Sequence, residues 1–260
     1  LSVESQTVIL KALQKSSREY QLMFYLALFT GARLQTICTL RIKSLIGCEL
    51  DSHGFIRLPV GAGTGIDSKF QKPMTLLIPN WLAQDLKIYI NSEQASQRRQ
   101  KSNYGESDEN YVFLTKLGTP FYTSKVEQQE LTEKIKSSDS FGMRLKLYEG
   151  EAVRSYLKVV LLPEIRLIDP QFPSFKFHDL RASFGMNLLE SQLQHLPEGH
   201  TAMTAVEYVQ ARMGHRNIST TLQYLNYKSR LQWRNKIQHE YESSLMKYVQ
   251  SSVNLAGDLS

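Results

Sequence analysis

The chain has 260 residues, of which 42% are hydrophobic and 22% are charged, a composition typical of a globular protein with one domain or two. Its formal net charge is +6 at pH 7 and its isoelectric point is about 9.2, which suits plain solubility as well as an anionic partner such as nucleic acid. With two cysteines and no apolar run approaching about 20 residues, the sequence argues against a disulfide framework and a membrane-spanning helix, and it indicates a reducing compartment.

The N-terminal part of the chain is expected to be helical. Apolar residues recur at helical spacing over residues 4–29, with a break around Ser16–Arg18, and this predicts two helices. Gly31 is placed to end the second helix, because glycine is the residue that most often follows a helix C-terminus. A further helix is then expected to begin within residues 33–40.

Residues 47–79 are expected to form a small antiparallel sheet. Residues 55–60 (FIRLPV) and 74–79 (MTLLIP) are rich in β-forming residues, and residues 47–50 (GCEL) are expected to add a third strand through the turn DSHG. The connection GAGTGIDSKFQK (61–72) is rich in glycine but lacks the lysine and hydroxyl residue of a phosphate-binding loop. We therefore interpret it as the flexible tip of a hairpin.

The middle of the chain has a less regular pattern. Residues 81–95 are predicted to be an amphipathic helix, 96–110 an exposed loop, 111–115 a short strand, and 124–168 weakly helical with a break at 137–143. Three prolines are expected to mark a loop before the next strong helical pattern: Pro163, Pro170 and Pro173.

A pair of polar residues marks the start of that next pattern. The segment FHDLRASFGMNLL is predicted to be a helix over residues 178–189. Residues three apart lie on the same face of a helix. The side chains of His178 and Arg181 are therefore expected to point the same way.

Another histidine and a tyrosine follow at helix ends. The segment TAVEYVQARMGH is predicted to be a helix that stops at Gly214 and leaves His215 just beyond its end. Ser219 is then expected to cap a new helix that carries Tyr224 in its second turn. The buried stripe of the first of these helices is expected to consist of Val206, Val209 and Met213.

These residue types suit a phosphodiester. Arginine binds phosphate oxygens in a planar fork and stays charged, and tyrosine can attack phosphorus when a proton acceptor or positive charge offsets its ordinary pKa of about 10. A phosphotyrosyl ester keeps the bond energy, so strands can be rejoined without ATP. Metal-dependent nucleases need carboxylates at spacings that the sequence does not show, and no cluster of ligands completes a zinc site.

Three motifs together resemble the tyrosine recombinase family of the phage-integrase type. They are TGARLQTICTL (30–40), HDLR (178–181) and MGHRNISTTLQY (213–224). That family has an arginine after a Thr-Gly pair, a His-x-x-Arg pair, a histidine after Leu-Gly, and a tyrosine nine residues later. The residues that match in order, type and spacing are Arg33, His178, Arg181, His215 and Tyr224, with Met213 in place of the usual leucine.

The resemblance also implies a catalytic lysine in the hairpin. The segment DSKFQKPMTLLIP offers Lys69 and Lys72, and Lys69 is favoured because it lies nearer the tip and hence nearer the DNA. Tyr227 is a rival for the nucleophile. It lies twelve residues after His215, whereas the family spacing of nine residues selects Tyr224.

The resemblance covers residues 5–230 and implies the fold. We expect a mostly α-helical α+β catalytic domain over residues 1–230, of the fold shared with type IB topoisomerases, with a small antiparallel three-stranded sheet. Segments near 96–110 and 135–170 are expected to be insertions. The tail, 231–260, is expected to be helical and either docks on a neighbouring protomer or packs on its own domain. The separate N-terminal DNA-binding domain of the family is expected to be absent from this chain, so that the chain alone binds DNA weakly.

The function that the resemblance implies is site-specific recombination or integration of double-stranded DNA, without metal, ATP or another cofactor. The protein is then expected to work as a homo-oligomer, a tetramer on DNA, in the cytoplasm of a prokaryotic cell. Arg33 and Arg181 would hold the phosphate, and Tyr224 would form the 3′-phosphotyrosyl link. The alternatives are a type IB topoisomerase, a DNA-binding module that has lost catalysis, and a structural helical protein with accidental matches.

Overall fold

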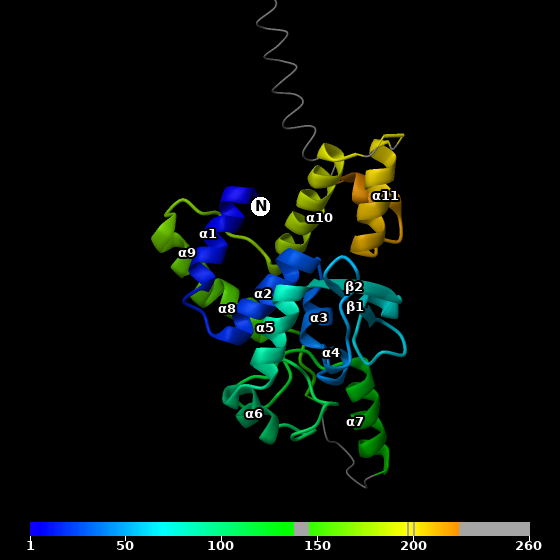
Figure 1. Ribbon diagram of the computed structural model, residues 1–260. Helices are drawn as coiled ribbons and strands as arrows, with labels where there is room; N and C mark the ends of the chain where they lie inside the picture. The colour runs from blue at the N-terminus through cyan, green and yellow to red at the C-terminus, as the bar shows by residue number, and fades with distance from the viewer. Residues whose placement is uncertain (138–145, 197, 200, 224–260) are drawn as a thin grey trace, which may run out of the picture.

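The computed structural model describes residues 1–137, 146–196, 198–199 and 201–223. Within these residues, helices surround a small antiparallel sheet, and the mostly helical α+β fold predicted from the sequence is confirmed (Figure 1). The predictions for Tyr224, Tyr227 and the tail 231–260 lie outside the described residues, as does part of the predicted insertion at 135–170. In the described part of the chain, no helix is long and apolar enough to span a membrane.

The N-terminal helices follow the prediction. Helix α1 spans Val3–Leu13, α2 spans Arg18–Thr30, and α3 spans Leu34–Cys38. Helix α2 is the centre of the larger core: its apolar residues are almost all buried, and it contacts α5, β2 and α10. It ends at Gly31, whose φ of 68° lies in the left-handed region, the conformation that glycine adopts at a helix end without steric cost.

The sheet has two strands in the described residues. Strand β1 (Phe55–Val60) pairs with β2 (Met74–Pro79) in the antiparallel sense, and alternate residues of both strands face the core, as expected for a sheet with one buried side. The third strand expected over 47–50 is reduced to a single bridge between Leu50 and Ile56. The short helix α4 (Lys43–Ile46) occupies the preceding residues and ends at Gly47, so only Leu50 reaches β1.

The hairpin tip has an unusual backbone. The turn η1 (Lys69–Gln71) closes with a hydrogen bond from the backbone N–H of Lys72 to the carbonyl of Lys69, and φ is 57° at Phe70 and 54° at Gln71. Two successive positive φ values are the signature of a type I′ turn, which favours asparagine and glycine. The left-handed conformation costs roughly 1–2 kcal/mol for any other residue.

Part of the loop expected over 96–110 is helical. Helix α5 spans Asn80–Ile90 and a separate helix, α6, spans Glu93–Gln100 with Ser92 as its N-cap. The prediction of exposure was wrong for Arg98, which is 4% exposed and forms an ion pair of 2.7 Å with the buried Glu19. A paired charge can be buried, and hydropathy patterns do not reveal the pairing.

The segment predicted as a strand over 111–115 forms only isolated bridges, between Arg41 and Tyr111 and between Leu114 and Pro120. It is nevertheless anchored. The guanidinium of Arg41 lies 3.9 Å from the centre of the Tyr111 ring and donates to the hydroxyl of Ser124. These contacts hold the residue just before α7 (Lys125–Ser137).

The helical prediction for 124–168 is confirmed for α7 and from Glu151 onward, whereas residues 146–150 are not helical. Helix α8 (Glu151–Tyr156), the π-helix η2 (Leu157–Leu161) and α9 (Leu162–Ile168) follow one another. Pro163 lies in the first turn of α9 rather than in the expected loop, because a proline lacks the N–H that the interior of a helix requires but is tolerated at its start. The wider π-turn precedes it, and the loop at Pro170 and Pro173 is confirmed.

The last described helices form a second, smaller core. Helix α10 spans Phe177–Gln194, and α11 spans Ala202–Met213 and ends at Gly214 with φ 57°. Residues 218–223 are helical, so Ser219 lies inside that helix and Asn217 precedes it, one correction to the predicted cap. The small core is made of Phe184, Leu189, Ala205, Val206, Val209 and Met213.

Candidate active site

Arg33 is placed by the end of α2. The chain leaves α2 through Gly31, and Arg33 takes an extended conformation as the N-cap of α3. A Cβ atom on Gly31 would overlap the ring of Phe184 from α10. The glycine therefore permits both the turn toward Arg33 and the close approach of α10.

Arg181 ties three helices together. It is 2% exposed, and its guanidinium donates to the backbone carbonyls of Gly31 and Met213. Those carbonyls belong to the C-terminal ends of α2 and α11, where backbone oxygens have no partner within their own helix and a positive charge is favourable. Arg181 thus fixes the two glycine-terminated helix ends from its position on α10.

His215 follows directly after Gly214 and is 8% exposed. Its Nδ1 lies 3.0 Å from the hydroxyl of Thr221, which is fully buried. When the hydroxyl donates to Nδ1, the proton of the neutral ring is carried by Nε2. In that tautomer Nε2 is the nitrogen of His215 that can donate a hydrogen bond, and its partner Thr221 is a residue that the sequence did not single out.

The candidate residues form one electrostatic cluster. Burial, followed by the positive charges of Arg181 and Arg33, lowers the pKa of His215 to about 4. The same causes in the same order lower the pKa of His178. Four of the six candidate residues, from α3, α10 and the end of α11, are thus close enough to act on one another.

Both hairpin lysines reach this cluster. Lys69 is among the charges that lower the pKa of His178, and Lys72 is among those that lower the pKa of His215. Lys69 begins the turn at the tip, whereas Lys72 starts the way back to β2. The structure brings both candidates to the site. Tyr224, the predicted nucleophile, comes directly after the last described residue of the helix that carries Thr221.

The depressed pKa of His215 predicts a pH effect on stability. Its pKa is about 4 in the folded protein and about 6.5 in an unfolded chain. Between these values the unfolded state binds more protons, so this histidine leaves stability unchanged above pH 6.5 and lowers it as the pH falls toward 4, by up to about 3 kcal/mol.

We expect urea unfolding at pH 7 and pH 4.5 to show a smaller loss of stability for His215→Gln than for the wild type. In NMR spectra, the His215 ring should titrate near pH 4. A titration midpoint near pH 6.5 in the folded protein would contradict the burial of this ring among cations.

Two hollows flank the cluster. A cavity of 470 Å³ is lined by Arg33, His178 and Arg181 on one side and by apolar residues of η2, α9 and the loop before α10 on the other. A more open groove of 500 Å³ runs between β2 and the end of α11 and includes Lys72 and His215. The further charged residues of this groove are Arg57, Arg212, Arg216 and Glu207, so positive charge prevails there.

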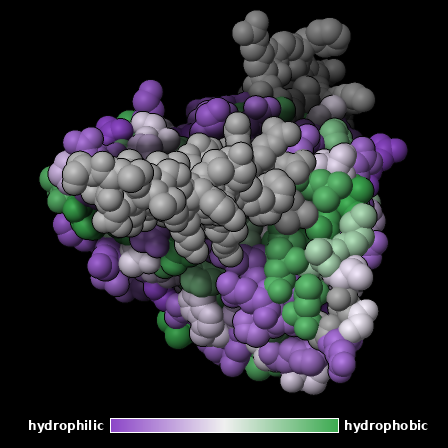
Figure 2. Space-filling view, turned by 90° about the horizontal axis from the view of Figure 1, so that it is seen from above, coloured by the Kyte–Doolittle hydropathy of each residue, from purple (hydrophilic) through white to green (hydrophobic). Residues whose placement is uncertain are grey.

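Seen from above, from the side of α10 and α11, the surface around the grey atoms mixes hydrophilic residues with a hydrophobic strip (Figure 2).

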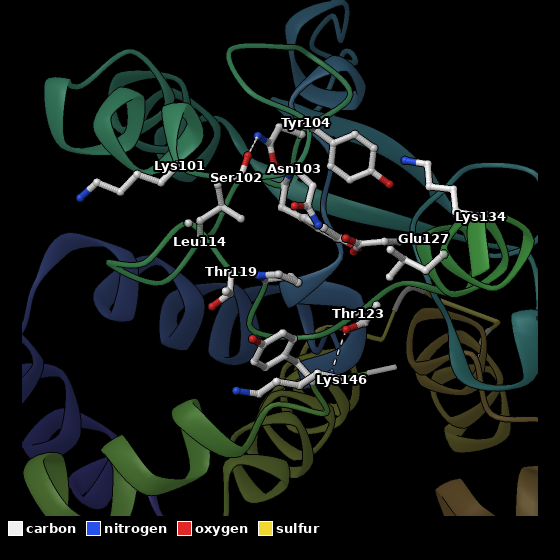
Figure 3. Close-up of a pocket in the computed structure, with 16 residues that line it drawn as sticks. Lys101, Ser102, Asn103, Tyr104, Leu114, Thr119, Thr123, Glu127, Lys134 and Lys146 are labelled. Atoms are coloured by element: carbon white, nitrogen blue, oxygen red, sulfur yellow. Dashed lines mark hydrogen bonds between the residues drawn. The ribbon is translucent and has the colours of Figure 1, made fainter. Parts of the chain in front are cut away.

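A third cavity, of 440 Å³, lies between α6 and α7, with Lys101 and Lys134 on opposite sides of it (Figure 3). None of the candidate catalytic residues that the structure describes lines it. No group of histidine, cysteine and carboxylate side chains that could hold a metal ion occurs among the residues that the structure describes.

Asp67 is a residue of this site that the sequence analysis missed. It is 2% exposed and accepts hydrogen bonds from the side chains of Gln35 (3.0 Å) and Gln71 (2.9 Å) and from the backbone N–H of Lys125 (3.2 Å). One carboxylate thereby joins the hairpin tip, the helix that begins after Arg33, and the N-terminus of α7. A helix N-terminus favours a negative charge. The only signal in the sequence was that Asp67 is the one acidic residue of the loop 61–72.

We expect Asp67→Asn to slow the reaction of the site and to lower the free energy of unfolding by about 1–3 kcal/mol. The NH₂ group of the new asparagine would face the N–H groups that now donate to the carboxylate, so hydrogen bonds would be lost. Asp51→Asn is the matched control: Asp51 accepts from the backbone N–H groups of His53 and Phe55, at the opposite end of the same hairpin. The measurement is the rate, per folded molecule, of the DNA cleavage that the family resemblance implies, beside urea unfolding. Equal rates for the two variants would show that Asp67 does not position the tip.

Comparisons with known proteins identify the family and agree with the fold. A model of the phage integrase family matches residues 2–230. Among solved structures, the chain is similar to the XerH site-specific recombinase bound to palindromic difH substrate in a post-cleavage complex, with a TM-score of 0.55 and 18% identity over 92% of this chain and 53% of that chain. It is also similar to the XerA recombinase, with a TM-score of 0.51 and 16% identity over 86% of this chain and 58% of that chain.

At these identities the similarity describes the fold, and the chain spans little more than half the length of either recombinase. The comparison with curated proteins found no match.

Proposed function

Because this chain belongs to the phage integrase family, we propose that it is the catalytic part of a site-specific DNA recombinase, acting on double-stranded DNA in the cytoplasm of a prokaryotic cell. The observation that carries the proposal is the convergence of Arg33, His178, Arg181 and His215 beside a hairpin with two lysines. A cluster of fixed cations and two neutral imidazoles, next to a positively charged groove, suits a phosphodiester better than any uncharged substrate.

The proposed reaction is a transesterification. The hydroxyl of Tyr224 attacks the phosphorus of one strand, His178 accepts its proton, and the 5′-oxygen leaves with a proton from Lys69. The tyrosine is then esterified to the 3′-phosphate. One phosphoester bond forms as another breaks, so the 5′-hydroxyl of a partner strand can reverse the step and release the tyrosine with no ATP.

The cluster supplies the charge stabilisation. Arg33 and Arg181 hold the non-bridging oxygens and neutralise the charge that develops on them. His215 donates from Nε2, since its other nitrogen lies against Thr221. The lowered pKa of His178 keeps that ring neutral at pH 7 and able to accept a proton.

Strand exchange requires two cleaved sites, and we propose a tetramer on DNA, with the tail 231–260 either docking on a neighbouring protomer or packing on its own. DNA affinity is proposed to come mainly from phosphate contacts and to fall steeply with salt.

The test is covalent attachment. The full-length protein is incubated with a plasmid library from its source genome, and the DNA that stays bound to protein under denaturing conditions is sequenced. We expect adducts at a few defined positions and, with two such sites, exchange of strands. Relaxation of any supercoiled plasmid without exchange would identify a type IB topoisomerase activity instead, and no adduct on any DNA would reject the proposal.

Lys69 and Lys72 can be distinguished by the leaving group. We expect Lys69→Ala to slow cleavage by about 10²–10⁴-fold, the usual contribution of a general acid. A substrate with sulfur in place of the leaving 5′-oxygen should restore the rate, because a thiolate leaves without a proton. Lys72→Ala is the matched control and should show neither the loss nor the rescue. The opposite result would assign the role to Lys72.

A further inference from the structure

The hairpin tip presents a large apolar side chain to solvent. Phe70 is 86% exposed, more than any other large hydrophobic residue in the described part of the chain. Single exposed hydrophobic residues are common on protein surfaces. The exposure of this ring therefore becomes informative only together with its backbone and its neighbours.

The backbone at Phe70 is unfavourable for this residue. Its φ of 57° lies in the left-handed region. A bulky aromatic residue is rare in this conformation, whereas asparagine or glycine adopts it at little steric cost. The free protein therefore gains nothing from phenylalanine here, either through burial or through backbone preference. Strained residues of this kind cluster at sites that act on a ligand.

The turn is held in this shape by its surroundings. The side chain of Gln71 donates to Asp67 at 2.9 Å, the hydroxyl of Ser68 donates to the carbonyl of Lys72 at 2.6 Å, and the backbone N–H of Ala62 donates to the carbonyl of Gln71 at 3.0 Å. These bonds come from both sides of the tip. The ring is thus presented by a rigid turn.

Phe70 also belongs to the turn that carries both candidate lysines of the active site. The ammonium group of Lys69 is 5.1 Å from the ring centre, and its positive charge lowers the pKa of His178. Lys72 lines the groove that contains His215. A DNA strand whose phosphate is held by these cations brings its bases within reach of the tip. An aromatic ring stacks on any base, and an apolar wedge can separate and kink neighbouring base pairs.

We propose that Phe70 is a DNA wedge, whose ring stacks on a base next to the cleaved phosphodiester and unstacks it from its neighbour. The inference rests on the proposed recombinase function. Before a strand can be transferred to a partner duplex, its bases must unstack from their neighbours. Phe70 starts this unstacking on the side of the leaving 5′-end.

The test measures the unstacking of bases in DNA that is bound by the full-length protein. The probe is a short duplex that contains a cleavage site mapped by covalent attachment, with the fluorescent base 2-aminopurine beside the cleaved phosphodiester. We expect the wild type to raise the fluorescence on binding and Phe70→Asn and Phe70→Gly to abolish the rise, while Phe70→Trp retains it. Strand exchange should slow about tenfold or more in the first two variants, the loss expected for one base–aromatic stack.

Two controls make the outcome decisive. Phe70→Asn and Phe70→Gly relax the turn, so they should be at least as stable as the wild type in urea, and their defect cannot come from unfolding. Leu117→Asn removes another apolar side chain, 78% exposed, from the turn that lies against α6, and it should change nothing.

A wild type that forms adducts, together with a Phe70→Asn variant that raises the fluorescence equally, overturns the wedge and leaves the recombinase function standing. A wild type that forms no adduct overturns both.

Discussion

Tyr224→Phe is expected to abolish the covalent protein–DNA adduct while leaving DNA binding largely intact. The substitution removes one hydroxyl, whose oxygen is the atom that we propose becomes esterified, and it keeps the aromatic ring. In the sequence, Tyr224 follows the last described residue of a helix whose Thr221 lies against His215. The measurement is the amount of DNA retained on protein under denaturing conditions, beside a gel-shift titration of the same samples.

Tyr227→Phe is the matched control, because it removes the same hydroxyl from the rival tyrosine three residues later. This variant should form adducts at the wild-type level. Mass spectrometry of the DNA-linked peptide from the wild type should place the modification on Tyr224. Adducts formed by Tyr224→Phe, or their loss in Tyr227→Phe, would refute the assignment and with it the order of the catalytic residues.

Arg181→Lys is expected to lower the rate of cleavage by about 10³–10⁵-fold, the range seen when an arginine that neutralises a phosphoryl transition state is lost. Lysine keeps the charge but not the planar fork, and its single ammonium group cannot hold the carbonyls of Gly31 and Met213 together with a phosphate. We also expect the free energy of unfolding to fall by about 1–3 kcal/mol for each of these two buried carbonyls that loses its hydrogen-bond donor.

The loss of activity must be separated from the loss of fold. Single-turnover cleavage at saturating DNA, corrected for the folded fraction from urea unfolding, gives the chemical effect alone. Arg154→Lys is the matched control, since Arg154 lines the same cavity but forms an exposed ion pair with Glu151, and such pairs contribute little. A corrected rate for Arg181→Lys within tenfold of the wild type would place the phosphate elsewhere.

The sequence predicted the parts of this fold whose signals are local. Helix α2, its stop at Gly31, both strands and the stop of α11 at Gly214 follow from periodicity and glycine, and the structure confirms them. The gathering of the motif residues also followed from the sequence, because their order and spacing matched a family. Their catalytic roles remain predictions.

The errors came from interactions between distant residues. The helix over Glu93–Gln100 was predicted in part as an exposed loop, because its polar pattern did not reveal that Arg98 would be paired with Glu19, seventy-nine residues away. Asp67 was missed for the same reason: its partners lie in three different elements. A sequence pattern describes one element at a time, whereas buried polar groups are satisfied between elements.

Arg181 has a consequence for how the enzyme can be switched off. The larger core contains α2, which leads into Arg33, while the smaller core of α10 and α11 ends next to His215 and consists of six buried residues in the described part of the chain. A small cluster of this kind opens at a lower free energy than the whole domain. Undocking of α11 from α10 would separate His215 from Arg33 and Arg181 and stop the proposed catalysis, yet leave most of the described residues folded and ready to close again.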